Sequence, residues 1–338
     1  MKIAILSPIN WRTPPRKYGP WELVASTIAE GLVDRGIDVT LFATSDSQTQ
    51  GKLESVCKVP LGEESSLDPK VWECLHISNL MEKANDYDLI HNHFDFLPLT
   101  YSGLIKTPMI TTIHGFSSAQ ILPVYKKYNK TTHYVSISKS DRQRDLNYIQ
   151  TIYHGINPED FPFKSQKEDY LLCFGRIHPD KGTHLAIQIA KEAGMPLKIA
   201  GLIQDQDYFN TQIKPHVDSG EVTYAGNAGS VIRSKLLGNA SALLHPICFE
   251  EPFGLSVVEA MMSGTPVVAF SRGSMPELIV HRKTGYLVEN VEEAVKAVQL
   301  LPDINPQACR DHAMKNFNQD RMVDEYIAAY KKILGGKK

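Results

Sequence analysis

Residues 249–279 read FEEPFGLSVVEAMMSGTPVVAFSRGSMPELI, and this stretch decides the fold expected for its part of the chain. Gly254 precedes an apolar run with helical spacing, and PVVAF (266–270) follows it as a buried strand. Glu251 lies just before the helix and Glu259 about two turns into it. Two interpretations of these acids compete. They cap the helix and stabilise its dipole, or they bind a ligand at the helix N-terminus.

The same alternation of strand and helix extends over the rest of the chain. The apolar run KIAILSP (2–8) is typical of a buried parallel strand. Pro20 suits a first helical position, and the apolar residues after it recur on one helical face. Further strands are predicted at DVTLFAT, DLIHNH (88–93), PMITTIHG (108–115), THYVSIS (132–138), YLLCFGR (170–176), LKIAG (197–201), VTYAG (222–226), ASALLHP (240–246) and TGYLVE (283–288).

This alternation predicts an α/β fold with two doubly wound, Rossmann-like domains. We expect the first domain in residues 1–162 and the second in residues 168–315, with the polar stretch near 157–168 as the linker. The helix expected at about 319–334 would pack back on the first domain. Open parallel sheets bind ligands at the carboxyl ends of their strands, and two such domains that face each other make a cleft between them. We therefore expect the chemistry in the loops after strands.

Composition excludes several classes of function. The net charge of −2 over 338 residues gives no global field that would attract nucleic acid. No run of about 18 apolar residues is present, so no segment is expected to span a membrane. The five cysteines are odd in number and form no CxxC pair, which indicates reduced thiols in a cytoplasmic protein.

Loops after predicted strands carry further candidate residues. Arg176 and Lys181 flank one such loop, where they would serve a phosphate or form an ordinary solvated basic loop. His114 ends a strand, a position that is more often structural. Gly19 follows the first strand, and a glycine there lets the backbone approach a phosphate closely.

The chain resembles the family 4 retaining glycosyltransferases, which are nucleotide-sugar enzymes with the GT-B fold. The resemblance extends over nearly the whole chain and is strongest from 170 to 290. It is carried by GRIHPDKG (175–182), EPFGLSVVEAMMSGTPVVA (251–269) and GSMPELI (273–279), with weaker support from YGPWE (18–22), IHG (113–115) and HGINPEDF (154–161).

The resemblance implies a retaining, metal-independent transfer of a hexose from a nucleoside diphosphate sugar to an acceptor hydroxyl, without a cofactor. Glu251 would accept hydrogen bonds from the sugar and Glu259 from the ribose diol. The backbone N–H groups of Phe253, Gly254 and Leu255 would hold the diphosphate. Family frequency favours UDP first and GDP second. The acceptor would be a carbohydrate, a small molecule or a lipid-linked sugar.

The resemblance also assigns the other candidates. Arg176 and Lys181 would stabilise the leaving diphosphate, and Gly19 would approach the donor. His114 would reach the donor sugar, so that His114 and Glu251 are the expected catalytic residues.

Three positions depart from the family pattern. Proline at position 20 replaces the second of two adjacent glycines and removes a backbone N–H. His154 stands where asparagine is usual, and Ser274 stands where a second glycine is usual. These changes put some donor or acceptor contacts in doubt.

Other interpretations stay open. A non-catalytic nucleotide-sugar-binding protein or partner subunit would fit the Pro20 departure. A phosphorolytic enzyme on a related fold would need a lysine-linked pyridoxal cofactor and a longer chain.

The basic stretch 125–145 is either a solvated face or a surface for an anionic acceptor or a peripheral membrane contact. The acidic triplets at 86–88 and 205–207 resemble a metal-binding motif of a different glycosyltransferase fold, which no other feature supports. Oligomeric state is not predicted.

Overall fold

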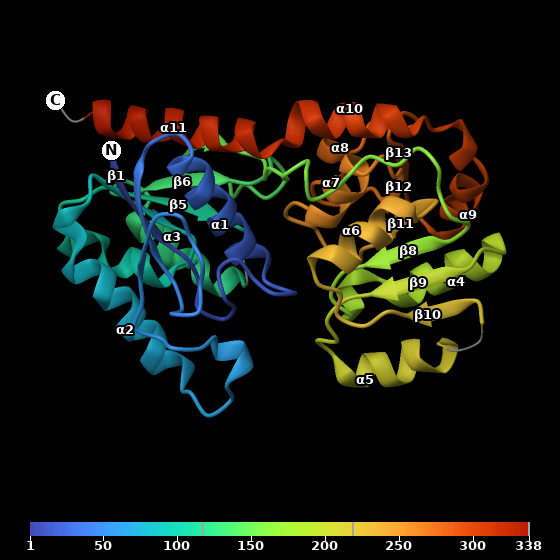
Figure 1. The fold of residues 1–338 in the computed structure, drawn as a ribbon, viewed down its shortest axis with the longest axis horizontal. Coiled ribbons are helices and arrows are strands. Elements are labelled where there is room, and N and C mark those ends of the chain that lie inside the picture. Colours follow the sequence, from blue (N-terminus) through green and yellow to red (C-terminus); the bar gives the residue numbers. More distant parts are fainter. Residues whose placement is uncertain (117, 218–219, 337–338) are drawn as a thin grey trace. The chain divides into compact units, whose positions relative to one another are not determined.

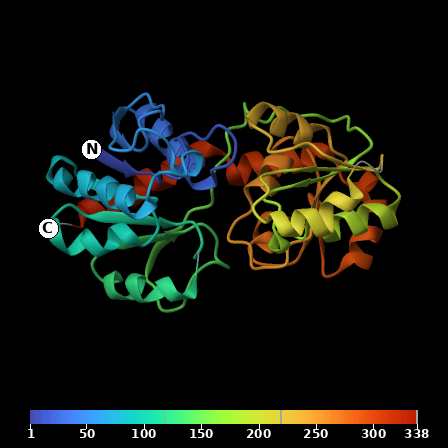
Figure 2. The same ribbon diagram turned by 90° about the horizontal axis from the view of Figure 1, so that it is seen from below.

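The computed structural model describes residues 1–116, 118–217 and 220–336. Contacts divide the chain into two compact units, unit 1 (Met1–Gly155 and Gln319–Lys338) and unit 2 (Ile156–Asn318). Each unit is built on one parallel sheet with helices around it (Figures 1 and 2). The predicted α/β fold class with two doubly wound sheets is confirmed.

The sheet of unit 1 has the strand order β3-β2-β1-β4-β5-β6-β7 among the described residues, and every pairing is parallel. Its strands are β1 (Lys2–Leu6), β2 (Asp38–Phe42), β3 (Lys52–Glu54), β4 (Leu89–Asn92), β5 (Met109–Ile113), β6 (His133–Ser136) and β7 (Tyr148–Thr151). Its helices are α1 (Pro20–Val33), α2 (Pro69–Glu82), α3 (Leu122–Tyr128) and α11 (Gln319–Gly335).

Helices cover both faces of this sheet, which explains the continuous apolar character of its strands. Ile3 and Ile5 of β1 point into a core that contains α1 and α11, while Ala4 and Leu6 point into a second core with α2 and α3. Alternate residues of a strand point to opposite faces, so both sets are buried. The last helix, α11, therefore belongs to the core of unit 1 (Figure 1).

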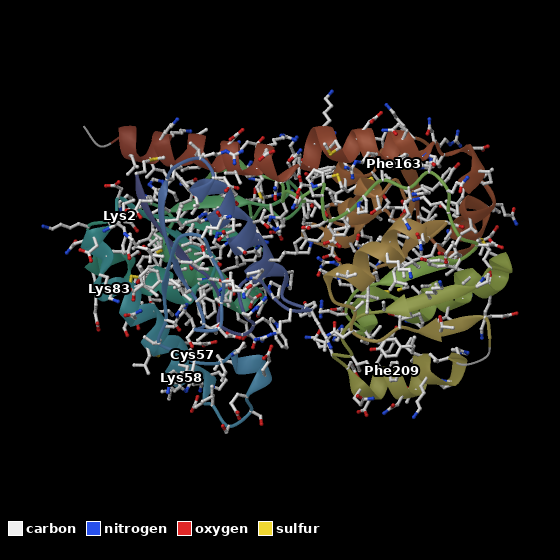
Figure 3. All side chains as sticks on the ribbon, in the orientation of Figure 1. Lys2, Cys57, Lys58, Lys83, Phe163 and Phe209 are labelled. Carbon is white, nitrogen blue, oxygen red and sulfur yellow. The ribbon has the colours of Figure 1, made fainter. Side chains whose placement is uncertain are left out.

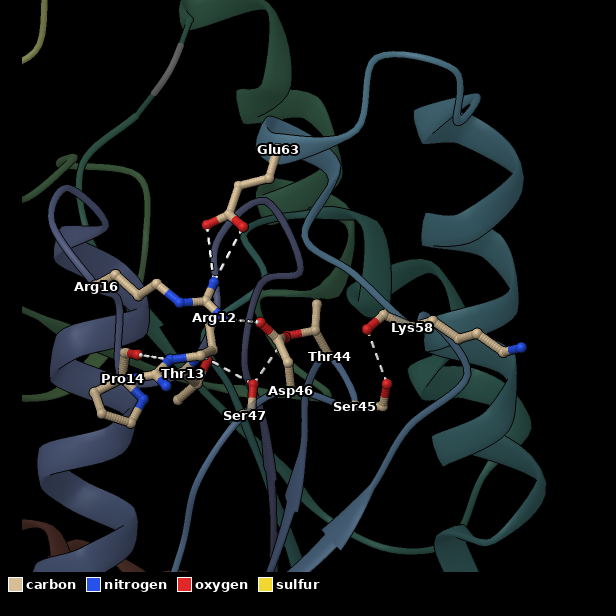
Figure 4. A network of polar contacts seen from close by, with 10 residues as sticks. All are labelled: Arg12, Thr13, Pro14, Arg16, Thr44, Ser45, Asp46, Ser47, Lys58 and Glu63. Atoms are coloured by element: carbon tan, nitrogen blue, oxygen red, sulfur yellow. Dashed lines mark hydrogen bonds and ion pairs between the residues drawn. The ribbon is translucent and has the colours of Figure 1, made fainter.

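The loop after β1 is fixed by a polar network (Figure 4). Thr13 N donates to Ser47 Oγ at 2.9 Å, and Thr13 O accepts from Gln48 N at 2.8 Å. Arg16 donates to both carboxylate oxygens of Glu63 and to Asp46 Oδ2, at 2.9–3.1 Å. The network links this loop to the loop after β2 and so fixes the backbone that leads into α1.

The sheet of unit 2 has the strand order β10-β9-β8-β11-β12-β13, again with parallel pairings. Its strands are β8 (Leu171–Phe174), β9 (Leu197–Ala200), β10 (Val222–Tyr224), β11 (Ala242–His245), β12 (Val267–Phe270) and β13 (Gly285–Val288). Its helices are α4 (Thr183–Ala193), α5 (Gln206–Tyr208), α6 (Ser230–Asn239), α7 (Leu255–Met262), α8 (Met275–Leu278), α9 (Val291–Gln299) and α10 (Pro306–Phe317).

The stretch 157–168, expected as a linker, instead packs within unit 2. Phe161 is buried, and its carbonyl accepts from Arg310 Nη1 at 2.6 Å. Phe163, labelled in Figure 3, packs closely on Gly264. A Cβ added at Gly264 would lie 2.7 Å from the Phe163 ring. Lys167 Nζ donates to Gly238 O at 2.9 Å. Apolar contacts and hydrogen bonds thus attach most of this stretch to the helices α6 and α10 and to the loop after α7 of unit 2.

Two expectations from composition concern the whole chain. No helix in the described part of the chain combines the length and the apolar character needed to cross a bilayer. All five cysteines are free thiols.

His76→Gln should reduce the loss of stability on acidification. His76 in α2 lies 2.9 Å from Ser7 O through Nε2, and burial lowers its pKa to about 4. A base with a depressed folded-state pKa stays neutral in the native protein while the unfolded chain takes up a proton below pH about 6.5. The contribution of the neutral, buried His76 to the free energy of unfolding is therefore fully present above that pH. It is lost progressively as the pH falls to about 4. Between pH 7 and pH 5 this amounts to about 2 kcal/mol.

Urea unfolding at the two pH values measures the difference between wild type and variant. All three tryptophans (Trp11, Trp21 and Trp72) lie in unit 1, so their fluorescence follows the unit that contains His76. Identical acid losses in the two proteins would show that His76 does not titrate as argued.

Candidate functional site

The strand order of unit 2 reverses direction at β8 and β11, which are neighbours in the sheet. Connections from these two strands leave toward opposite sides, and open α/β sheets commonly bind ligands at the carboxyl ends of strands at such a point. The loop after β8 carries Arg176 and Lys181, and the loop after β11 carries Glu251. The topology therefore places three predicted site residues at the switch point of one sheet.

The loop after β8 is shaped by a short turn and a glycine. His178 accepts at Nδ1 from Asp180 N at 3.3 Å and so caps the turn Pro179–Lys181. Gly182 follows in the left-handed conformation with φ 64°, and α4 begins after it. A Cβ at Gly182 would lie 1.9 Å from Pro246 O. The backbone of this loop thus lies directly against the end of β11, which only glycine permits.

Lys181 and Glu251 meet across the two loops. Lys181 Nζ forms an ion pair with Glu251 Oε2, and it also lies 4.8 Å from the centre of the Phe249 ring. His245, the last residue of β11, has its Nε2 atom 3.5 Å from the same carboxylate oxygen. The side chains of Lys181, Glu251 and His245 are 16%, 10% and 5% exposed. A nearly buried carboxylate is therefore paired with the Lys181 ammonium and has the His245 imidazole close by.

These neighbours keep Glu251 ionised. Burial by itself would raise the pKa of the carboxyl, but the Lys181 charge and the contact with His245 outweigh it and lower the pKa to about 2. Burial lowers the pKa of His245 despite the nearby carboxylate, so its imidazole is neutral at pH 7. The cluster thus contains a carboxylate anion, an ammonium cation and a neutral imidazole.

The loop that carries Glu251 is held by the segment after β12. Gly273 N donates to Glu250 Oε2 at 2.6 Å, and Ser274 N donates to Glu251 O at 2.9 Å. The Ser274 hydroxyl donates to Phe253 O. The serine that departs from the family pattern therefore fixes the backbone before α7. Gly254 precedes α7 in the left-handed region with φ 96°, and Leu255 begins the helix.

Arg176 and Glu259 have other partners. Arg176 Nη1 donates to Gln204 on the loop after β9. Glu259 lies in the second turn of α7, is 2% exposed, and has Oε1 3.5 Å from Arg233 Nη1 of α6. Burial raises the pKa of Glu259, and the Arg233 charge partly offsets this. The structure thus brings Lys181 and Glu251 into contact with each other. Arg176 and Glu259 each contact a different residue outside this pair.

The two candidates of unit 1 also follow strands. Gly19 precedes α1 with φ 150°, and a Cβ there would lie 2.8 Å from Pro15 Cβ. Pro20 is the first residue of α1, where its missing N–H would have had no helical partner. His114 follows β5, is 8% exposed, and stacks on Trp21 with ring centres 5.4 Å apart. Both of its ring nitrogens face other histidines, His93 and His154.

Several residues of these clusters were not among the predicted site residues. His245 has a detectable signal, since it is a polar residue at the end of the apolar strand ASALLHP. Arg233 has none, because its carboxylate partner lies on another helix. Glu22 is 3% exposed, accepts from Trp11 N at 3.1 Å, and has its pKa raised by burial to about 7. Glu22 is the last residue of the motif YGPWE, for which the sequence predicts no role.

Comparisons with known proteins agree with this architecture. The model of Glycosyltransferase Family 4 matches residues 22–160, and that of Glycosyl transferases group 1 matches residues 157–316. An uncharacterized glycosyltransferase of Methanocaldococcus jannaschii is 25% identical over 336 residues, which is 85% of this chain and 85% of the relative.

Solved structures show the same fold. A glycosyltransferase involved in avilamycin A biosynthesis has a TM-score of 0.75 at 23% identity and covers 99% of this chain and 98% of its own. The Anabaena protein HepE, solved in complex with UDP-glucose, has a TM-score of 0.75 at 20% identity and covers 98% of this chain and 100% of its own.

The strand orders of the two units and the likeness to these solved structures show the GT-B fold. The chain belongs to glycosyltransferase family 4, as the matches along almost all of its length show.

Among residues 1–116, 118–217 and 220–336, no group of three or more His, Cys, Asp or Glu side chains is arranged to hold a metal ion. Arg176 and Lys181 are cationic side chains on the loop after β8.

Proposed function

We propose that this glycosyltransferase moves a hexose from a nucleoside diphosphate sugar to an acceptor hydroxyl, with retention of anomeric configuration and without a metal ion. UDP-sugars are the first candidates for the donor and GDP-sugars the second. The observation that carries the proposal is the buried, ionised Glu251 in contact with Lys181 at the carboxyl ends of β8 and β11. Anion and cation lie together beside the N-terminus of α7.

The diphosphate is proposed to bind Lys181 of this cluster together with Arg176 from the same loop. Lys181 offers a compact charge and Arg176 a planar fork, and backbone N–H groups at Gly254 and Leu255 precede the first hydrogen-bonded turn of α7. These groups stabilise the negative charge that grows on the leaving diphosphate. Phe253 contributes through its backbone, since its side chain is buried. Gly19 of unit 1 is proposed as a further backbone contact to the donor.

The two acidic residues are proposed to bind the sugar and the ribose of the donor. Glu251 would accept hydrogen bonds from sugar hydroxyls, and its charge would stabilise the oxocarbenium-like carbon as the glycosidic bond breaks. Glu259 is proposed for the ribose diol. It would exchange part of its interaction with Arg233 for the two hydroxyls. His114 is proposed to act on the donor sugar, and a donor phosphate oxygen to take the acceptor proton.

A relative supports the order of donors. HepE, which shares the fold, was solved with UDP-glucose, and this favours uridine diphosphate as the leaving group. The acceptor is proposed to be a carbohydrate, small molecule or lipid-linked sugar in a cytoplasmic setting. The basic stretch 125–145 is a proposed contact for anionic acceptors or the membrane surface, because Lys126 and Lys127 lie in the last turn of α3.

A donor panel tests the proposal. Each nucleotide sugar is scored for thermal stabilisation and for slow donor hydrolysis, and the product of the best donor is analysed by NMR at the anomeric carbon. A bound donor at about 100 times its dissociation constant should stabilise the protein by about 2.7 kcal/mol. We expect a UDP-sugar to rank first and the product to keep the donor's anomeric configuration. An inverted product, or activity that requires an added divalent ion, would contradict the proposal.

A further inference from the structure

Arg233 and Glu259 lie in the first two turns of neighbouring helices of unit 2. Helix α6 begins after β10 and helix α7 after β11, and the two helices pack against each other (Figure 1). A helix that follows a strand of a parallel sheet begins near the carboxyl edge of that sheet, where ligands bind. Both side chains therefore come from the edge of the sheet that also carries Lys181 and Glu251.

The two charges form a nearly buried pair that is poorly hydrogen-bonded. Arg233 Nη1 lies 3.5 Å from Glu259 Oε1, and the side chains are 16% and 2% exposed. Within the described residues, no hydrogen bond joins the guanidinium to the carboxylate or links either group to a third residue. Arg233 Nε is fully enclosed, whereas the two Nη atoms and the two carboxylate oxygens are not. Donors and acceptors of this pair are therefore unused and still reach open space.

An ion pair that only joined the two helices would be expected to have closer contacts. Arginine and carboxylate groups commonly pair through two parallel hydrogen bonds, and a buried pair offsets its desolvation only when its other donors and acceptors are also satisfied. Arg310 of α10 shows such satisfaction in the same unit, since its Nη1 donates to Phe161 O at 2.6 Å and to Met262 O. The unsatisfied groups of Arg233 and Glu259 thus point to a ligand that completes the pair.

Two other neighbours orient the Arg233 guanidinium without using its Nη donors. Its central carbon lies 5.6 Å from the centre of the Phe161 ring. Burial raises the pKa of Asp160, and the Arg233 charge partly offsets this rise, so the two charges lie near each other. In the described part of the chain, neither Phe161 nor Asp160 accepts a hydrogen bond from Arg233. The Nη atoms therefore stay available to a ligand.

A vicinal diol has the groups that the pair lacks. Each hydroxyl has one hydrogen to donate to a Glu259 oxygen and lone pairs to accept from an Arg233 N–H. The identity of the diol rests on the proposed function, which assigns the donor's ribose to Glu259. We propose that Arg233 is a second contact to this ribose, in which an Nη atom donates to a hydroxyl that itself donates to Glu259. Arg233 is then a specificity-determining residue that selects a ribonucleotide over its deoxy analogues.

Isothermal titration of the intact protein with UDP, 2′-deoxy-UDP and 3′-deoxy-UDP tests this role, and the guanosine series replaces them if GDP binds more tightly. We expect wild type to bind UDP about 10- to 100-fold more tightly than at least one deoxy analogue, because a missing hydroxyl leaves charged groups unpaired. Arg233→Met should lower that ratio by about tenfold, the contribution of one charged hydrogen bond. The exposed control Lys235→Gln, on the same helix, should keep the wild-type ratio.

A double variant keeps the test decisive if Arg233→Met does not fold because Glu259 is left buried without a cation. Arg233→Met combined with Glu259→Gln removes both charges, and its ratios are compared with those of Glu259→Gln alone. We expect the double variant to discriminate about 3- to 10-fold less. Unchanged ratios on removal of Arg233 would overturn the inference and leave the proposed function standing. Failure of wild type to bind either UDP or GDP would overturn the proposed function and the inference with it.

Discussion

Glu251→Gln should lower the turnover number by about 100- to 1000-fold, the usual effect of removing one charge-stabilising group from an active site. The substitution keeps the shape of the side chain and removes its negative charge. That charge is proposed to face the anomeric carbon as the bond to the diphosphate breaks. The effect should appear mainly in kcat, because the positive charge on the sugar develops only in the transition state. Steady-state kinetics with the best donor measures both constants.

The substitution should also cost stability, and the two effects are separable. A carboxyl with a folded-state pKa near 2 and an ordinary unfolded value contributes about 3 kcal/mol above pH 4.5, which is lost as the pH falls toward 2. Assays well below the melting temperature isolate the effect on turnover. Glu292→Gln is the matched control, because Glu292 is an exposed partner of Lys296 on α9. A kcat within about twofold of wild type for Glu251→Gln would remove the carboxylate from the reaction, since even a weak catalytic contact exceeds that.

Gly182→Ala should destabilise unit 2 far more than Gly194→Ala, although the two glycines flank the same helix. Both have left-handed backbones, with φ 64° and 67°. Alanine at Gly194 has no atom within 4 Å and should cost about 1–2 kcal/mol for the backbone conformation alone. Alanine at Gly182 adds a Cβ 1.9 Å from Pro246 O, so the loop must move, at about 4 kcal/mol or more in total.

Comparing the two alanine variants isolates the packing of the loop after β8, because the substitution and the backbone φ are the same at both positions. Hydrogen exchange of the amides in β8 and β11 measures the loss in unit 2, and donor binding measures the displacement of Lys181. We expect Gly194→Ala to bind donor as wild type does and Gly182→Ala to bind it more weakly. Equal melting temperatures and equal donor affinities in the two variants would contradict the role given to this close contact.

Long apolar runs made most of the fold predictable from the sequence. Strands buried on both faces, such as β1, read as continuous apolar segments, and α1 and α4 begin and end near proline or glycine. The edge strands β3 and β7 were missed because KLE and YIQT are short and mixed in polarity. An edge strand has one hydrogen-bonded neighbour and less burial, so its residues carry little pattern.

The site was predictable where chemistry depends on local spacing, and less so where it depends on tertiary contacts. Glu251 and Lys181 were identified by motif resemblance, and the structure places them in contact. The Arg233 partner of Glu259 lies on another helix, and no periodicity links the two. His93, His114 and His154 follow three different strands, so these side chains are adjacent only once the sheet has formed.

Isothermal titration of nucleotide sugars shows whether the strand ends of β8 and β11 hold the donor. UDP-glucose and GDP-mannose are titrated into wild type, Lys181→Gln and the partly exposed control Lys198→Gln. We expect binding of at least one donor to wild type and to the control. We expect an affinity about 10- to 100-fold weaker for Lys181→Gln, because one charged hydrogen bond to the donor is lost. Equal affinity in all three proteins, or no binding of any donor to wild type, would contradict it.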